Sequence, residues 1–274
     1  MTSVQAIRKR RAKVRWARSY ASTGVAVWKL NLSAARLRSL PKFDRYVFAL
    51  LGHIFNDLMI SQKLLHVSRV HPTRSNPITR EAGVGVALYM VRTLAARAKE
   101  VMEALRDKKI SAHVEKNFFE PAGLIDTWKS SLKLFYQMDH DWLAAVRNAH
   151  AFHYMRPDQF DPYLNDEHCD YAHALVGKKY GDTFFTWADI RAGHAMLDQV
   201  DSNDPFAGLG RMLDELGALL GGLCDCLAQS LQKYAKDQLT EGDALGGPRR
   251  VPAPDFESFT LPYFFWAPRK ATKT

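Results

Sequence analysis

A short segment, residues 147–154, places a fixed cation, an amide and two imidazoles close together in the chain. Asn148 follows Arg147 directly, five residues separate Arg147 from His153, and His150 lies between them. A guanidinium binds phosphate oxygens through paired N–H donors, and histidine exchanges a proton near neutral pH. These residue types predict a site that binds a phosphate and moves a proton beside it.

A single helix is expected to carry these side chains. Asp139 is a favourable N-cap, and Pro157 cannot continue a helix. At about 100° per residue, four side chains share roughly a third of the helix circumference: Arg147, His150, His153 and Tyr154. Asn148 falls on the apolar side, where it needs hydrogen-bond partners and is expected to hold the helix geometry.

The segment from Arg147 to Tyr154 resembles the R-x(4–6)-H signature of HEPN domains (higher eukaryote and prokaryote nucleotide-binding domains). The resemblance implies a bundle of helices, a homodimer formed along the motif helix and, in active members, metal-independent RNA cleavage. It makes Arg147 the motif arginine, Asn148 the polar residue after it and His153 the motif histidine. His150 lies outside the signature. His150 and Tyr154 are candidates for a second acid or a base-stacking platform.

The expected function is that of a metal-independent endoribonuclease of the toxin–antitoxin or phage-defence type, with RNA as substrate and no cofactor. His153 would accept the proton of a ribose 2′-hydroxyl, and Arg147 would stabilise the charge that develops on the phosphate. A non-catalytic helical module that binds RNA, a nucleotide or a protein partner, such as an antitoxin or a defence-system component, is the alternative.

Two plainer interpretations of the motif remain open. In the first, Arg147 makes only an ion pair, and the histidines face solvent or a satisfied interface. In the second, His150 and His153 share a metal ion, because residues three apart lie on one side of a helix. The adjacent arginine would repel such an ion, so we expect no metal.

The excess positive charge lies at the N-terminus. The net charge is +9, yet no Asp or Glu precedes Asp44, whereas eleven Lys and Arg residues do. This arm, residues 1–43, includes Arg10 and Arg11, which we expect to bind RNA phosphates. A targeting peptide and an inert solvated tail are the alternatives.

The composition is that of an ordinary globular chain. It has 274 residues, of which 47% are hydrophobic and 24% charged. No apolar run approaches the ~18 uncharged residues that a membrane span needs, so no membrane contact is expected. The three cysteines do not form a disulfide framework and suit a reducing compartment. We therefore expect a cytoplasmic location.

Apolar periodicity predicts an all-α fold, and the resemblance implies that the helices form a HEPN-like bundle. An irregular, partly β excursion is expected after the motif helix. Besides the motif helix, helices are expected at residues 44–67, 79–107, 124–136, 187–196 and 206–238. Thr79 is the expected cap of the second helix, and residues 108–122 are expected to be irregular. The β-prone residues 183–187 are expected to form a short strand or hairpin. A short turn at Met138 and Asp139 would make helix 124–136 and the motif helix antiparallel neighbours.

The expected organisation has three parts. They are a basic arm (1–43), a HEPN-like helical domain (44–240) with an irregular insertion (157–204), and an aromatic, proline-rich tail (241–274). The tail aromatics would either bind another chain or lie in a groove on their own bundle or dimer partner. We favour the groove.

Overall fold

The computed structural model describes residues 24–68, 76–151, 156–164, 173–178, 182–240, 246–253 and 263–264. Most of these residues are helical, and the only regular strands among them are β1 (Gly24–Val27) and β2 (Arg249–Pro252). The predicted all-α class is confirmed. Within these ranges, no helix combines the length and the apolar character that crossing a bilayer requires.

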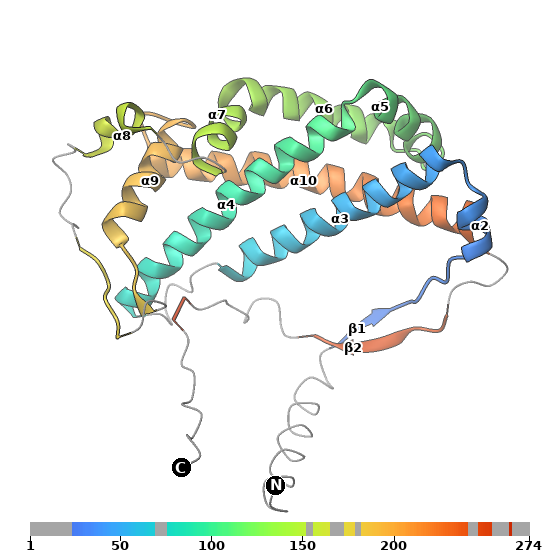
Figure 1. Cartoon of the computed structure of the whole chain (residues 1–274), viewed down its shortest axis with the longest axis horizontal. Coiled ribbons are helices and arrows are strands. Elements are labelled where there is room, and N and C mark those ends of the chain that lie inside the picture. The colour runs from blue at the N-terminus through green and yellow to red at the C-terminus, as the bar shows by residue number, and fades with distance from the viewer. Residues whose placement is uncertain are drawn as a thin grey trace, which may run out of the picture. The chain divides into compact units, whose positions relative to one another are not determined.

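The chain divides into two compact units. The first comprises Met1–Arg45 and Tyr234–Phe259, and the second comprises Tyr46–Lys233 and Thr260–Thr274. In chain order the described helical segments are α2 (Ala34–Ser39), α3 (Lys42–Ser68), α4 (Pro77–Leu105), α5 (Lys108–Val114), η1 (Glu115–Phe119), α6 (Ile125–Met138), η2 (Asp139–Leu143), α7 (Ala144–Val146), η3 (Arg147–Ala151), α8 (Pro157–Leu164), α9 (Thr186–Asp198), α10 (Pro205–Tyr234) and η5 (Ala235–Leu239) (Figure 1). The segments labelled η are π-helical turns.

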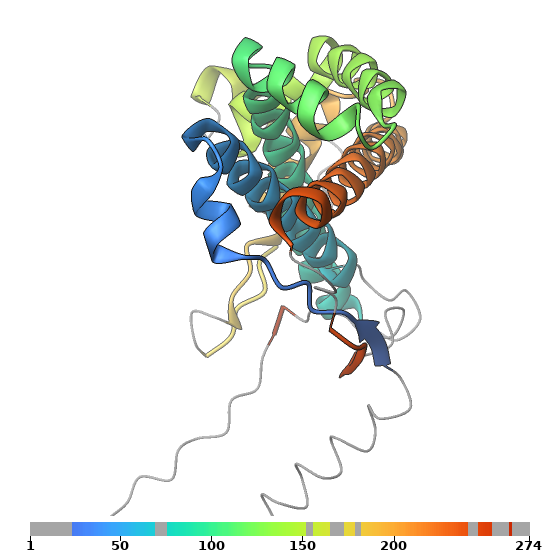
Figure 2. The ribbon, with the colours of Figure 1, turned by 90° about the vertical axis from the view of Figure 1, so that its right-hand side faces the viewer.

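Helix α4 is the element on which the motif segment rests, where the motif segment means the continuous helical path of η2, α7 and η3 (residues 139–151). It packs against η2, α7, η3 and α9. Figures 1 and 2 show α3, α4 and α10 running through the middle of the second unit, with α5 and α6 along one edge. Asn76, rather than the predicted Thr79, caps α4: its Oδ1 accepts the N–H of Thr79 at 2.8 Å. Pro77 opens the first turn, where its missing N–H costs nothing.

Residues 108–122, predicted to be irregular, are mostly helical. Asp107 starts α5 by accepting the backbone N–H groups of Lys109 and Ile110 at 3.0 and 3.1 Å. An aspartate that caps two free N–H groups is a common helix start. The helical path then continues through η1. Gly123 follows, with φ of 72°, a left-handed conformation that favours glycine.

Large aromatic side chains fill the core of the second unit. Those among the largest fully buried side chains are Trp128, Trp142, Phe118, Phe119 and Phe135. Trp142 also donates its indole N–H to Glu215 Oε2 of α10 at 2.6 Å. Arg211 donates to the second oxygen of Glu215 at 2.9 Å and forms an ion pair with Asp141. Trp142 and Asp141 of η2 therefore connect the motif segment to α10.

The region after the motif helix is more helical than predicted. Pro157 begins α8, a position where proline is well tolerated. The expected strand at 183–187 is reduced to an isolated antiparallel bridge between Leu175 and Phe184. The predicted helix at 187–196 is present as α9. Tyr163 of α8 donates its hydroxyl to Asp198 of α9 at 2.6 Å. Burial and this hydrogen bond raise the pKa of Tyr163 to about 12.

One described residue of the aromatic tail lies against the helical unit to which it belongs. The hydroxyl of Tyr263 donates to the carbonyl of Thr183 at 2.7 Å. Its ring meets Phe184 edge-on, with centroids 5.1 Å apart. At Tyr263 the contact follows the favoured interpretation, in which the tail packs on its own bundle. Residues 254–262 and 265–274 lie outside the described part of the chain.

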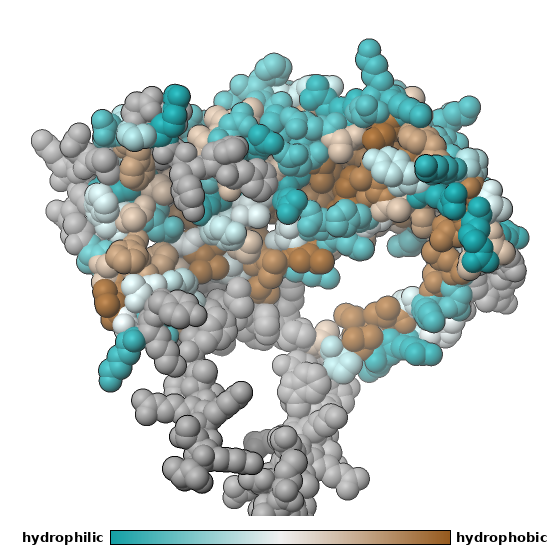
Figure 3. All heavy atoms as spheres, in the orientation of Figure 1, coloured by the Kyte–Doolittle hydropathy of each residue, from teal (hydrophilic) through white to brown (hydrophobic). Residues whose placement is uncertain are grey.

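The first unit contains a two-stranded antiparallel ribbon that the sequence did not predict. β1 pairs with β2 so that Val25 lies opposite Val251 and Val27 opposite Arg249. All eight residues of the ribbon are exposed, and Figure 3 shows its apolar atoms at the surface. Within the same unit, the Ser33 N–H donates to the Leu239 carbonyl at 2.7 Å. The described part of the predicted arm is therefore ordered by long-range pairing.

Candidate functional site

The motif lies on a helical path that continues from α6 without a turn. Asp139 has φ of −66° and ψ of −39°, so it is helical and is not the predicted N-cap. The predicted turn at Met138 and Asp139, and the antiparallel pairing derived from it, are wrong. Instead, η2 and η3 interrupt the α-helix with π-type turns. Their i→i+5 hydrogen bonds widen the helix, so the angle between successive side chains falls below the value for a regular α-helix.

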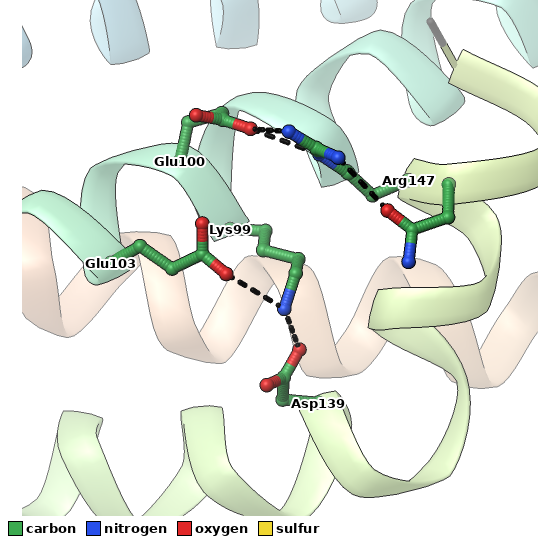
Figure 4. Close-up of polar contacts among 6 residues, drawn as sticks. Lys99, Glu100, Glu103, Asp139 and Arg147 are labelled. Carbon is green, nitrogen blue, oxygen red and sulfur yellow. Dashed lines mark hydrogen bonds and ion pairs between the residues drawn. The ribbon is translucent and has the colours of Figure 1, made fainter. Parts of the chain in front are cut away.

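Arg147 makes an ion pair with Glu100, which lies 47 residues earlier on α4 (Figure 4). Nε and Nη2 both donate to Oε1 of Glu100, at 2.9 and 2.5 Å. The side chains of Arg147 and Glu100 are 30% and 41% exposed. The Glu100 carboxylate therefore holds the guanidinium of Arg147 at a position that solvent reaches.

A second ion pair joins α4 to η2, beside the first in Figure 4. The ammonium of Lys99, a buried residue, lies 2.5 Å from Asp139 Oδ1 and 3.0 Å from Glu103 Oε1. Burial acts to lower the pKa of Lys99, but the hydrogen bonds to Asp139 and Glu103 outweigh it and raise that pKa above its ordinary value. Together the two ion pairs bind the motif segment to α4.

The residues of these two ion-pair groups carry a net negative charge. The groups contain two cations, Lys99 and Arg147, and three carboxylates, those of Glu100, Glu103 and Asp139. An anion would meet a net negative surface here unless a carboxylate moves away. Binding of a phosphate to Arg147 therefore requires an exchange with Glu100.

Asn148 is exposed, and this corrects the prediction that it lies on the apolar side. Its Oδ1 accepts a hydrogen bond from Nη1 of Arg147 at 2.9 Å. The amide orients the neighbouring guanidinium, and the surrounding helix is not its partner.

His150 is buried, with 9% of its surface exposed, although the sequence placed it on the same arc as Arg147. The wider π-type turn at η3 changes the angle between the two side chains. Burial, with a smaller contribution from the charge of Arg92, lowers the pKa of His150 to about 4. The imidazole is therefore neutral at physiological pH. A catalytic acid works best with a pKa near the working pH, so this environment suits packing better than proton donation.

Four predicted site residues cannot be placed, because they lie outside the described residues. They are His153, Tyr154, Arg10 and Arg11. Of the seven predicted site residues, the structure thus positions Arg147, Asn148 and His150. It brings Arg147 and Asn148 together by a hydrogen bond and places His150 in the core.

The structure adds residues that sequence reasoning missed. Lys99 carried a usable signal: it follows the buried Ala95 by four positions, so a cation falls on the apolar face of α4 and needs a partner. Glu100 carried no such signal, because its partner is distant in the chain.

Burial, opposed by the nearby charge of Arg92, raises the pKa of Asp189 on α9. Arg92 therefore interacts with titratable groups on both η3 and α9.

Among the residues that the structure describes, no group of three or more His, Cys, Asp or Glu is positioned to hold a metal ion. The chain matches no protein-family model, no curated protein and no solved structure. Its candidate site must therefore be interpreted from its own geometry.

Proposed function

We propose that this chain is a metal-independent endoribonuclease of the HEPN type, with Arg147 as the residue that binds the scissile phosphate. The supporting observation is the geometry at Glu100. Two nitrogens of a partly exposed guanidinium converge on one carboxylate oxygen. A phosphate oxygen can be held by the same pair of donors, since guanidinium forms this fork with both kinds of anion.

The proposed reaction transfers a phosphoryl group within RNA. His153, neutral before the step, accepts the proton of a 2′-hydroxyl as the 2′-oxygen forms a bond to phosphorus. The bond from phosphorus to the 5′-oxygen breaks, and that oxygen takes up a proton. Arg147 stabilises the charge that builds on the phosphate oxygens. The products are a 2′,3′-cyclic phosphate and a 5′-hydroxyl, and no metal takes part.

The resemblance on which this proposal also draws implies a homodimer along the motif helix. A second copy would add cations that the described cluster of one chain does not supply. The basic arm, with Arg10 and Arg11, would add more. A toxin or phage-defence role, with an antitoxin or another defence component as partner, follows from the same proposal.

Substitution of the two motif residues tests the proposal. Arg147→Ala and His153→Ala are each expected to slow RNA cleavage in EDTA by about 100-fold or more, because each removes transition-state stabilisation or proton transfer. The measurement is the rate at which cyclic-phosphate ends appear. Growth arrest on expression should disappear in parallel.

Arg97→Ala is the matched control, since it removes an exposed cation from α4 that pairs with Asp57 of α3 and is not a motif residue. It should cleave RNA as fast as the parent chain. Equal rates for the parent and both motif variants would refute the ribonuclease proposal.

Glu100 offers a second and independent test. Glu100→Gln removes the charge that competes with RNA for Arg147. We expect kcat/KM to rise roughly 2- to 5-fold, because an exposed ion pair contributes about 0.2–1 kcal/mol. Glu103→Gln is the control, since it removes a neighbouring carboxylate that contacts Lys99 instead. A Glu100→Gln chain that is less stable and no more active would show that the ion pair serves only the fold.

The second candidate is a non-catalytic helical module that binds RNA, a nucleotide or a protein partner. Two observations favour it: Arg147 is already engaged by Glu100 and Asn148, and His150 is buried and neutral. RNA binding that is weakened by Arg147→Ala, without any release of cyclic-phosphate ends, would select this candidate.

A further inference from the structure

The two-stranded ribbon of the first unit presents side chains to solvent on both of its faces. All eight residues of β1 and β2 are exposed, and so are Trp28 and Lys29, which follow β1 directly. These residues, 24–29 and 249–252, form the ribbon surface. The sheet has no third strand among the described residues. A lone two-stranded ribbon is marginally stable in water, so a bound partner would stabilise this one.

One face of the ribbon combines apolar side chains with a cation. Directly paired residues, and residues two apart along a strand, point to the same face. Val25 pairs with Val251, and Val27 pairs with Arg249, so these four side chains share one face. The three valines are between 44% and 55% exposed. Arg250, which follows Arg249, points to the other face.

The cations of the ribbon surface are not balanced by acidic residues. Residues 24–33 and 246–253 contain Lys29, Arg249 and Arg250 but no Asp or Glu. Within the described part of the chain, none of these three side chains forms an ion pair or a hydrogen bond. Each of them is therefore available to an anion without the exchange that Arg147 requires.

The positive charge of the whole chain belongs to this unit. By sequence, the first unit has 15 Lys and Arg residues against 6 Asp and Glu, a net charge of +9, whereas the second unit has 23 of each. A nucleic-acid strand gains affinity for such a surface because binding releases its condensed counterions. A second copy of this chain would bring the same positive charge to the contact, and like charges repel. The charge thus favours a polyanion over self-association.

The exposed indole of Trp28 favours a single strand over a duplex. This side chain is 53% exposed and lies next to the valine face in the chain. Aromatic rings stack on the faces of bases, and cations beside them follow the phosphates, in proteins that bind single strands without sequence preference. In a duplex the base faces are already stacked on one another, so the ring would have no partner.

We propose that the ribbon surface binds single-stranded nucleic acid, with Arg249 and Arg250 on phosphates and Trp28 stacked on a base. The exposed valines give the bases an apolar support. This surface goes beyond the ribonuclease proposal, because it needs neither Arg147 nor His153 and takes part in no chemical step.

Fluorescence anisotropy with the full chain and a labelled 12-nucleotide oligo(dT), at several salt concentrations, tests the proposal. The probe lacks the 2′-hydroxyl that the proposed cleavage needs, so binding is measured whether or not the chain is a ribonuclease. Arg249→Ala combined with Arg250→Ala should weaken binding roughly 10-fold or more. It should also reduce the slope of log K against log salt by about 1.4, since each phosphate contact with a single strand contributes about 0.7.

Trp28→Ala should weaken binding roughly 5-fold or more and leave the salt slope unchanged, because stacking releases no counterions. Two variants of the second unit are the controls. Arg97→Ala removes an exposed cation from α4, and Phe206→Ala removes a ring that is 84% exposed on α10. Both should bind oligo(dT) with the affinity and the salt slope of the parent chain.

Three outcomes would overturn the proposal. Unchanged oligo(dT) affinity in the ribbon variants would show that the ribbon does not contact the strand. Equal affinity for a duplex of the same length, with no effect of Trp28→Ala, would reduce the ribbon to a cationic surface without base contacts. A dimer that Val25→Asp disrupts, in a chain that does not bind oligo(dT), would assign the ribbon to a second copy.

Discussion

Trp142→Ala is expected to lower the free energy of unfolding by about 3–5 kcal/mol, the usual cost of removing a large aromatic side chain from a core. The Trp142 side chain is fully buried, and its N–H is 2.6 Å from Glu215. The variant loses apolar burial and leaves a cavity between the motif segment and α10. Urea unfolding followed by circular dichroism measures the change.

Trp28→Ala is the control, because Trp28 is 53% exposed. Its cost should stay within about 0.5 kcal/mol, as for most surface substitutions. Trp142→Phe separates packing from hydrogen bonding, since it keeps a ring and loses the N–H. A cost below 1 kcal/mol for Trp142→Ala would contradict the packing described here.

His150 is expected to make the protein sensitive to acid. The unfolded chain binds a proton at His150 near pH 6.5, whereas burial lowers the pKa of this group in the folded state to about 4. Between these values the unfolded state binds more protons, so stability falls as pH decreases. The loss from pH 7 to pH 4 amounts to about 3 kcal/mol.

His150→Leu removes this dependence and keeps an apolar side chain of similar size in the core. The free energy of unfolding, measured by urea titration at several pH values, should fall less steeply in this variant than in the parent chain. His140→Gln, at an exposed position of η2, is the control and should follow the parent curve. The raised pKa of Asp189 acts in the opposite direction and is present in all three proteins. Identical slopes for the parent and His150→Leu would exclude His150 as the source.

The two ion pairs between α4 and the motif segment connect these stability predictions to the proposed function. Lys99 and Asp139 hold the segment in place, whereas Arg147 and Glu100 are more exposed. The buried pair is the better candidate for a structural contact, and the exposed pair can exchange with a ligand at lower cost. The pair of Lys99 and Asp139 therefore anchors the proposed site close to Glu100, the residue that a bound phosphate has to displace from Arg147.

Much of the helical architecture could be predicted, because amphipathic periodicity is local. The apolar positions Val47, Leu51, Ile54 and Leu58 recur at helical spacing and all become buried in α3. The predicted helices at 44–67 and 206–238 correspond to α3 and to α10 with η5. Some of the errors lie at the ends of elements. Asn76 and Asp107 act as caps that periodicity does not reveal.

The sequence alone indicated that Arg147, Asn148 and His150 share one helical segment, because they lie within four residues in a run of helix-compatible side chains. Only the tertiary structure decided what each side chain contacts. The partner of Arg147 comes from α4, and the strands of the ribbon come from opposite ends of the chain. Such pairings depend on how helices and strands pack, which short-range periodicity does not encode. The sequence also did not reveal the π-type turns. They change the angle between successive side chains along the motif, so that His150 enters the core and Asn148 faces solvent.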